Sequence, residues 1–490
     1  MSDTPPVTHS IEARFDALAL LTATLLGIGI RAFFMAQPMR LDEAYTFLYY
    51  LNQGRDPFYY NVPNNHVFHT LLAKLAVLIG GAAPAVIRLP AFAAGVLCIP
   101  AIYFVCKRFN PQAGLLAALG MAVFPYMILY STMARGYSLI MLFTLLLTLA
   151  GQRYLDQPSR MRCVMIAVLS ALGLWTIPTM MFPLAGLYLW LTLMILIQAR
   201  NLVALLRNFL LPTLGLTALL TVIFYIPVVI ASHGSETLFS TQYVNARPWN
   251  DFLTHIAPHL RQIFTDFFRD VPTAAKYLGF LLAGIGLFAA VRRRAWSALL
   301  LLPCILLGAL VIFFAKQAIP FVRTWIYLIP FFLLFADLGY SALTEKLQST
   351  PRLTLAAVLL AGGLIYAGSL AATDAISRYA DTGSFPEAQT VARTMKPLLT
   401  GNEFIAVMDT ANFPLYYYLC IEGAPPQKPD LDPKTVRRYF VVQNSWYPLS
   451  NLTTQPVEQI FAFGDAAVYT SISPNERIWP GFVFDCRAGG

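Results

Sequence analysis

The sequence predicts a polytopic α-helical membrane protein that ends in a small α/β domain. Of its 490 residues, 57% are hydrophobic and only 12% are charged, and the mean hydropathy of +0.60 is far above that of an ordinary soluble domain. Apolar runs of about 17 to 25 residues recur along the first three quarters of the chain, and each is long enough to cross a bilayer as a helix. Beyond Ala372, polar residues return at the density of a soluble domain.

The apolar runs predict about 11 transmembrane helices. We expect a membrane domain over 1–372, and the N-terminal run through Gln37 has the length of an uncleaved first span rather than that of a signal peptide. The expected spans lie near 17–35, 86–106, 112–131, 138–154, 162–178, 181–199, 209–232, 275–291, 296–315, 324–342 and 353–372.

The C-terminal segment, residues 373–490, predicts the small α/β domain. The stretches FIAVMD and RRYFVVQN have the composition of β-strands. The six cysteines show no spacing typical of a metal or redox site. Cys420 and Cys486 both fall in this domain, and the sequence leaves open whether they form a disulfide.

The basic residues indicate topology. The net charge of +9 comes from short clusters between apolar runs, which is typical of cytoplasmic loops and not of a nucleic-acid-binding protein, so we expect no nucleic-acid partner. Successive spans pair up between these clusters only if 66–79 does not cross the membrane. That stretch is short and contains His66, His69 and Lys74, which favours an interfacial helix. The N-terminus is then inside and the C-terminal domain is extracytoplasmic.

This topology brings the reactive side chains to the extracytoplasmic face. LDEAYTFLYY at 41–50, NNHVFH at 64–69, STMARGY at 131–137 and KQAIPFVRT at 316–324 all fall there. The loop over 233–272 also falls there, and its apolar residues recur at helical spacing, which predicts a second interfacial helix. The span interiors contain few ionisable residues, mainly Arg31 and Asp337, whereas transporters usually carry ionisable or broken-helix sites at the midplane.

The motifs resemble a known superfamily. NNHVFHTLLAKLAVLIGG, IRLPAFAAGVLCIPAIYFVCKRF and FPYMILYSTMARGYSL, with LDEA before them, look like the GT-C superfamily of polyprenyl-phosphate-sugar-dependent glycosyltransferases. The chain is similar to glycosyltransferase family 39, which includes protein O-mannosyltransferases and the transferases that place aminoarabinose or galacturonic acid on lipid A. The resemblance covers 38–140, with a weaker one at PFVRTWIYLIPFF, and the chain has His66-Val67 where many members have a Pro after the His or a Lys in its place.

The resemblance implies a GT-C fold and a transferase of the cell envelope. We expect a bacterial inner-membrane enzyme with an acidic pair in its first external loop. Its donor would be a polyprenyl-phosphate-linked sugar. Its acceptor would be a hydroxyl of a lipid, glycan or protein, as in lipopolysaccharide or protein glycosylation, and the anomeric configuration would be inverted.

This chemistry assigns roles to the acidic pair. The acceptor hydroxyl must lose a proton as it attacks the anomeric carbon, and Asp42 is the expected base. Glu43 orients Asp42 or binds a divalent cation. The alternative is that the pair caps a helix at the interface or pairs with Arg40.

The departing phosphate requires cationic contacts. The candidates are Arg135, Arg323 and, more weakly, Lys316, with Tyr137 beside the first of them. The alternative is that the arginines extend to lipid headgroups and that Tyr137 belongs to an aromatic belt.

Two histidines suggest a further site. His66 and His69 stand three apart on one predicted helix, so their side chains share a face. His66 and Asn65 are expected to bind substrate. A divalent metal held by Glu43 and His66 is one prediction, and hydrogen bonding of the histidines to headgroups is the alternative.

No nucleotide cofactor is expected, because the chain contains neither GxxxxGK[ST] nor a strand followed by GxGxxG. The alternative functions are a transporter or a flippase for lipid-linked glycans, a non-catalytic membrane scaffold and, among enzymes, an oligosaccharide ligase that uses a pyrophosphate-linked donor.

Overall fold

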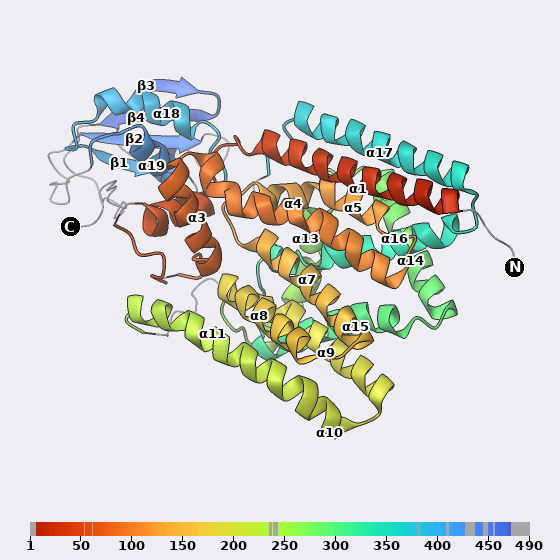
Figure 1. The fold of residues 1–490 in the computed structure, drawn as a ribbon. Helices are drawn as coiled ribbons and strands as arrows, with labels where there is room; N and C mark the ends of the chain where they lie inside the picture. The colour runs from red at the N-terminus through yellow and green to blue at the C-terminus, as the bar shows by residue number, and fades with distance from the viewer. Residues whose placement is uncertain are drawn as a thin grey trace, which may run out of the picture. The chain divides into compact units, whose positions relative to one another are not determined.

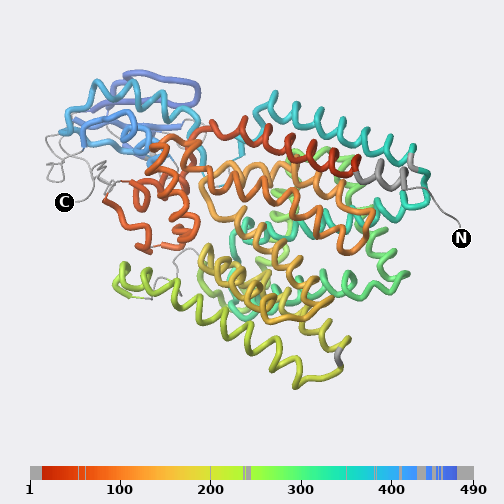
Figure 2. Tube along the Cα trace, viewed as in Figure 1, coloured from red at the N-terminus to blue at the C-terminus, as the bar shows by residue number. Residues whose placement is uncertain are grey.

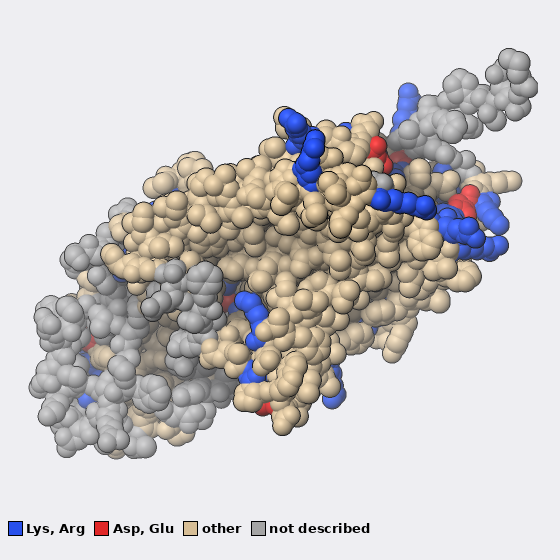
Figure 3. All heavy atoms as spheres, turned by 90° about the horizontal axis from the view of Figure 1, so that it is seen from below, with Lys and Arg blue, Asp and Glu red and all other residues tan. Residues whose placement is uncertain are grey.

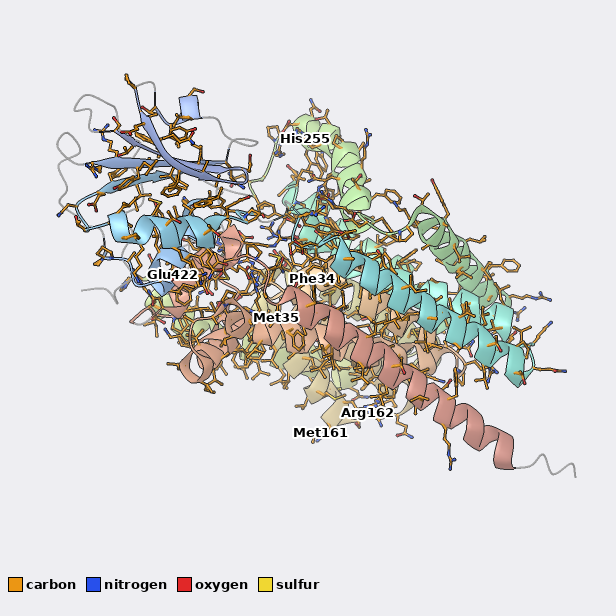
Figure 4. The ribbon with its side chains drawn as sticks, turned by 90° about the horizontal axis from the view of Figure 1, so that it is seen from above. Phe34, Met35, Met161, Arg162, His255 and Glu422 are labelled. Carbon is orange, nitrogen blue, oxygen red and sulfur yellow. The ribbon has the colours of Figure 1, made fainter. Side chains whose placement is uncertain are left out.

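The computed structural model describes residues 6–52, 54–60, 62–234, 238, 244–379, 381, 383–407, 411–426, 437–443, 449–453 and 456–471, and the remainder is grey in Figure 2. The chain divides into two compact units. We call Met1–Phe34, Tyr60–His69 and Pro90–Ile376 the helical unit. We call Met35–Tyr59, Thr70–Leu89 and Ser377–Gly490 the mixed unit, because it contains helices and a β-sheet. Figure 4 labels Phe34 and Met35, where the chain passes from one unit to the other.

The helical unit is built from long apolar helices and several shorter ones (Figure 1). In chain order they are α1 (Pro6–Phe34), most of α4 (Pro84–Phe109), α5 (Leu115–Val123), α6 (Pro125–Ser131), α7 (Tyr137–Asp156), α8 (Arg160–Thr176), α9 (Met181–Ala199), α10 (Leu202–Leu205), α11 (Leu211–Ala231), α13 (Trp249–Phe267), α14 (Thr273–Arg292), α15 (Trp296–Lys316), α16 (Leu328–Thr344) and α17 (Ser349–Ala372). The short turns η2 (Pro178–Met180), η3 (Leu206–Leu210) and η4 (Val322–Trp325) join some of them.

Eight of the described helices are long and apolar enough to cross a membrane. They account for eight of the predicted spans. The other three predicted spans correspond to α8 and α16, which have 17 residues each, and to the pair α5 and α6. The predicted helical membrane architecture is therefore confirmed, with one span divided into two short helices.

Glycine allows two helix pairs of this unit to approach closely. A Cβ added at Gly286 of α14 would lie 2.1 Å from the Phe335 carbonyl oxygen of α16, and one at Gly308 of α15 would lie 2.3 Å from the Gly186 backbone nitrogen of α9. Small residues at such crossings bring backbones into van der Waals contact, which is the main source of helix association in lipid. Much of the face shown in Figure 3 carries neither acidic nor basic side chains, as a lipid-facing surface requires.

Helix α13 confirms the helix predicted within 233–272. Phe252, His259 and Phe267 are buried, and a neighbouring apolar stripe of Trp249, Leu253, Leu260 and Phe264 is exposed. His255, labelled in Figure 4, lies on this helix among exposed polar residues. An exposed apolar stripe beside a polar face is typical of helices that lie in the plane of the interface.

The mixed unit contains a four-stranded sheet with the order β1-β2-β4-β3. Its strands are β1 (Phe404–Val407), β2 (Arg438–Gln443), β3 (Glu458–Phe463) and β4 (Ala466–Ser471), and β1 pairs parallel with β2 while the other neighbours are antiparallel. FIAVMD and RRYFVVQN therefore supply β1 and β2, as predicted. Cys420 is disulfide-bonded, and Cys486 lies outside the described residues.

The helices of the mixed unit carry the acidic pair. They are α2 (Leu41–Thr46), which continues into a wider turn η1 (Phe47–Leu51), α18 (Ala388–Met395), α19 (Asn412–Ile421) and the short turns η5 (Lys396–Leu398) and η6 (Leu449–Asn451). The unit boundaries fall within α3 (Val67–Gly80) and α4. Helix α3 confirms the short helix predicted over 66–79, except that His66 precedes its first residue.

Candidate functional site

The acidic pair lies in the first turn of α2, where the helix dipole favours negative charge. The two carboxylates have different surroundings. Asp42 is half-buried, whereas Glu43 is fully buried and its Oε1 accepts a hydrogen bond from the Arg40 backbone N–H at 2.9 Å. The two side chains therefore differ in accessibility, and Asp42 is the more accessible of the two.

Glu43 forms a buried ion pair with Arg88 of α4, within the mixed unit. The Arg88 Nε lies 3.0 Å from Glu43 Oε2, and Nη2 contacts Oε1. The same guanidinium donates to the carbonyl oxygens of Met35 at 2.7 Å, Gln37 at 2.6 Å and Pro38 at 3.0 Å. Arg88 thus ties the segment before α2 to the acid at its start, and this supports the predicted orienting role of Glu43.

Sequence reasoning did not single out Arg88. The available signal was one arginine in the apolar run IRLPAF, because a charge in such a run requires a partner. Arg40, the alternative partner of the acidic pair, directs its guanidinium to Gln37 Oε1 at 3.1 Å and to the carbonyl oxygens of Ser377 and Asp381 at 3.3 and 3.1 Å.

Four predicted binding residues form a cluster in the helical unit. His66 Nε2 lies 3.0 Å from Arg135 Nη2, and the His66 ring packs edge-on against Tyr137 with centroids 5.1 Å apart. Arg323 Nε donates to the Tyr137 hydroxyl at 2.9 Å. These residues come from the position before α3, the loop before α7, the first residue of α7 and the turn η4. The structure therefore brings together His66, Arg135, Tyr137 and Arg323.

Gly136 makes the cluster possible. Its backbone N–H donates to His66 Nδ1 at 2.8 Å. A Cβ at this position would lie 2.6 Å from Thr176 Cγ2 and 3.3 Å from the His66 ring, so a larger residue would displace one of them. The glycine in ARGY is thus explained by close packing.

The protonation of His66 creates an anion-binding arrangement. Burial lowers the pKa of His66 well below its ordinary value, and the positive charge of Arg135 lowers it further, so the ring is neutral. Because Gly136 N–H donates to Nδ1, the single ring proton lies on Nε2 and faces the Arg135 guanidinium, which is also a donor. Two donor groups therefore lie 3.0 Å apart, and one of them carries a positive charge. Such a pair favours an anionic oxygen placed beside both.

His69 adds a second buried histidine. It is 0% exposed, and among the described residues neither of its ring nitrogens has a hydrogen-bond partner. Burial, followed by the charge of Arg135, lowers its pKa to about 3. A neutral imidazole with both nitrogens unsatisfied is energetically costly, because each buried polar atom has lost its hydrogen bonds to water.

Asn65 lies next to the cluster residue His66, and Lys316 does not join the cluster. The Arg135 guanidinium donates to the backbone carbonyl of Asn64 at 2.7 Å, while Asn65 is buried beside it. Lys316, at the end of α15, is exposed, and within the described ranges no hydrogen bond or ion pair links it to His66, Arg135 or Tyr137.

The residues do not fit the metal site predicted at Glu43 and His66. Both Glu43 oxygens contact Arg88, and both His66 ring nitrogens contact Arg135 or Gly136. No group of three or more His, Cys, Asp or Glu side chains able to hold a metal occurs in the part of the chain that the structure describes. The ion pair and the histidine contacts occupy the atoms that would otherwise coordinate the ion.

Arg31 supports the segment that carries Arg135. Pro125 has no N–H and so breaks the predicted span 112–131 into α5 and α6. The buried Arg31 guanidinium donates to the carbonyl oxygens of Met121 at 2.8 Å and Ala122 at 2.7 Å, and to Ser131 Oγ at 2.8 Å. Arg31 therefore satisfies carbonyls freed at the break and holds the end of α6.

Comparisons with known proteins agree with this architecture. Residues 64–230 match the family model described as dolichyl-phosphate-mannose-protein mannosyltransferase. No curated protein matches the sequence. Among solved structures, ArnT from Cupriavidus metallidurans in the apo state has a TM-score of 0.57 at 15% identity and covers 96% of this chain and 100% of its own.

Two further structures have the same fold. ArnT bound to undecaprenyl phosphate has a TM-score of 0.56 at 15% identity and covers 95% of this chain and 99% of its own. The Archaeoglobus fulgidus oligosaccharyltransferase tethered to an acceptor peptide has a TM-score of 0.50 at 13% identity and covers 87% of this chain and 69% of its own. The shared fold and the family match over 64–230 support a membrane glycosyltransferase of the GT-C superfamily. Within that superfamily the chain is related to glycosyltransferase family 39.

Proposed function

We propose that the protein transfers a sugar from a polyprenyl-phosphate donor to a hydroxyl of an envelope lipid, glycan or protein. The observation that carries this proposal is the convergence of two guanidinium groups on Tyr137. Arg323 Nε donates to the phenol at 2.9 Å, and Arg135 Cζ lies 6.0 Å from the ring centroid. Two positive charges at one site favour an anion such as a lipid phosphate. ArnT in complex with undecaprenyl phosphate and the family match to a dolichyl-phosphate-mannose transferase support a donor of this class.

The proposed reaction is a direct displacement. Asp42 takes the proton of the acceptor hydroxyl, and the hydroxyl oxygen forms a bond to the anomeric carbon as the bond from that carbon to the phosphate oxygen breaks. The phosphate leaves with the bonding electron pair, and Arg135 and Arg323 stabilise its charge. A single displacement inverts the anomeric configuration, and Glu43, tied to Arg88, orients the base.

The setting of the reaction is part of the proposal. The helices establish an integral membrane protein. We infer that it lies in a bacterial inner membrane, with the acidic pair, the His66 cluster and the C-terminal domain over 373–490 on the extracytoplasmic side, because the basic loops lie at the other ends of the predicted spans. A transporter is not favoured, since the ionisable span residue Arg31 makes structural hydrogen bonds.

The test is reconstitution with defined substrates. Purified protein in lipid should consume a polyprenyl-monophosphate sugar, release polyprenyl phosphate and form a glycoside of inverted configuration with a hydroxyl acceptor. A longer donor chain should bind more tightly, by about fourfold per methylene buried at roughly 0.8 kcal/mol. Assays with added and with chelated divalent cations test the metal predicted at Glu43 and His66. Equal rates would agree with the partners that these two side chains have in the structure, and loss of activity on chelation would require other ligands. Consumption of a nucleotide sugar or retention of configuration would contradict the proposal.

A further inference from the structure

Three side chains share one face of the helix that carries the acidic pair. Asp42, Tyr45 and Tyr49 are half-buried, whereas the intervening Ala44 and Phe47 are buried. Spacings of three and four residues place side chains on the same side of a helix. The helix widens into η1 at Phe47–Leu51, and such turns frequently mark functional sites.

The two tyrosines and a phenylalanine of α19 form an aromatic cluster within the mixed unit. The rings of Tyr45 and Tyr49 stack with centroids 4.1 Å apart and an interplanar angle of 16°. Phe413 meets them edge-on, with centroids 4.9 Å from Tyr45 and 6.1 Å from Tyr49. Phe413 is itself half-buried, so all three rings keep part of their surface at the boundary with solvent.

Polar groups surround these rings. Burial raises the pKa of Tyr49, the neighbouring Tyr45 raises it further, and the charge of Arg55 opposes the shift, so Arg55 lies within electrostatic range of the phenol. Tyr59 also acts on this pKa, and its side chain is 39% exposed. The aromatic cluster therefore has a rim of phenols and a cation, unlike the interior of a hydrophobic core.

We propose that Tyr45, Tyr49 and Phe413 form a binding subsite for a pyranose sugar ring beside Asp42. A pyranose has a face of C–H groups and a rim of hydroxyls. The C–H face packs against the electron-rich surface of aromatic rings, and the hydroxyls bond to polar groups such as phenols and a guanidinium. Asp42 on the same helix face is then positioned to take a proton from a hydroxyl of that sugar or of its reaction partner.

This inference rests on the proposed function for the role of Asp42, but the binding subsite is tested without turnover. The ring belongs either to the sugar of the donor or to a saccharide acceptor, and both have the same chemistry. Steady-state kinetics distinguish the two sources. A variant of Tyr45 that raises KM only for the lipid-phosphate sugar assigns the donor, and one that raises KM only for the acceptor assigns a glycan acceptor.

The decisive experiment is saturation-transfer NMR with the full-length protein in lipid nanodiscs. The probes are the methyl glycosides of mannose, galactose, glucose and N-acetylglucosamine. At least one of them should receive magnetisation from aromatic protons, most strongly at the C–H groups of one ring face. This readout requires no donor lipid and no catalysis, so an inactive protein that still binds a glycoside would contradict the proposed function and leave the binding subsite supported.

The variants are chosen to separate binding from folding. Tyr45→Leu keeps apolar volume but removes the flat ring, and it should weaken glycoside affinity by about tenfold at most, the magnitude of one aromatic contact. Tyr45→Phe keeps the ring and should retain most of the transfer signal. Phe461→Leu on β3 is the matched control, because Phe461 is also a half-buried aromatic with a ring neighbour in the mixed unit.

Two results would overturn the proposal. One is the absence of magnetisation transfer to every methyl glycoside in the wild-type protein. The other is an unchanged signal in both Tyr45→Leu and Tyr49→Leu while their melting temperatures match that of Phe461→Leu. If Tyr45→Leu fails to fold, the comparison of Tyr49→Leu with Tyr49→Phe gives the same decision.

Discussion

Arg88 forms a buried ion pair with Glu43, the residue that follows the proposed base Asp42. Both side chains are 0% exposed, and Arg88 also bonds to three backbone carbonyls before α2. The pair therefore holds the start of α2 and, with it, the position of Asp42. Removal of one partner of a buried ion pair destabilises a protein far more than replacement of both partners.

Removal of one partner of this pair should destabilise the protein. Glu43→Gln or Arg88→Met alone should lower the free energy of unfolding by about 3 to 5 kcal/mol, because one charge remains buried without compensation. The double variant should recover part of that loss. Thermal unfolding in lipid nanodiscs measures the effect, and additive losses in the double variant would show that the two side chains are not coupled.

Asp42→Asn should abolish transfer without loss of the fold. The amide cannot accept the acceptor's proton, so turnover should fall by about two to four orders of magnitude. The measurement is release of polyprenyl phosphate, with Asp56→Asn as the control, because Asp56 is an exposed aspartate of the same unit whose Oδ1 accepts a hydrogen bond from the Phe58 N–H. Retained turnover in Asp42→Asn would remove it from the role of base.

Arg135→Gln should weaken binding of the lipid phosphate. Loss of a hydrogen bond to a charged group costs roughly 1.5 to 3 kcal/mol, so the Kd for polyprenyl phosphate should rise by about one to two orders of magnitude. Arg135→Lys should lose less, because the charge remains. Arg261→Gln on the exposed part of α13 is the matched control, and equal affinities in the two glutamine variants would contradict an anion site at the His66 cluster.

Stability should fall in acid because of His69. Its pKa is lowered from 6.5 to about 3 in the folded protein, so the folded state binds fewer protons than the unfolded state between these values. The stabilisation is fully present above pH 6.5 and is lost as the pH falls toward 3. The slope is at most about 1.4 kcal/mol per pH unit for one group. In His69→Leu the melting temperature should fall less steeply than in the wild type as the pH is lowered. An equal fall in both proteins would refute the assignment.

Cysteine labelling should define the topology. The described free cysteines Cys98, Cys106, Cys163 and Cys304 are buried, so background labelling should be low. New cysteines at Gln112 and Arg160 should react only from the cytoplasmic side, and one at Asn402 only from the other side. If Gln112 reacted from outside, helix α3 would cross the membrane and Arg135 would lie on the opposite face from the acidic pair and His66.

Helix positions could be read from the sequence because hydropathy and length act locally along the chain. The eight long apolar helices, the short helix α3, the helix α13 and the strands β1 and β2 each depend on residues close together in sequence. Hydropathy and length did not predict the helix break at Pro125. The run 112–131 is apolar between its polar ends, and hydropathy does not register the missing N–H that divides it.

Residue types also identified most of the candidate site. Asp42, His66, Arg135, Tyr137 and Arg323 were singled out by their place in motifs that share one face of the predicted topology. Lys316 met the same criterion but is exposed. Its position in the motif could not reveal where the long side chain would extend once α15 had formed.

Tertiary structure decided which partners these residues have. The Glu43 and Arg88 side chains are 45 residues apart in sequence, and those of His66 and Arg135 are 69 apart. Hydropathy and helical periodicity carry no information about such pairings, because each pairing arises only when separate helices pack and water is excluded. Buried charges and polar groups have no water to bind, so they must pair with the protein groups that the fold places next to them. Glu43 is therefore a partner of Arg88 instead of a metal ligand, and His66 stays neutral.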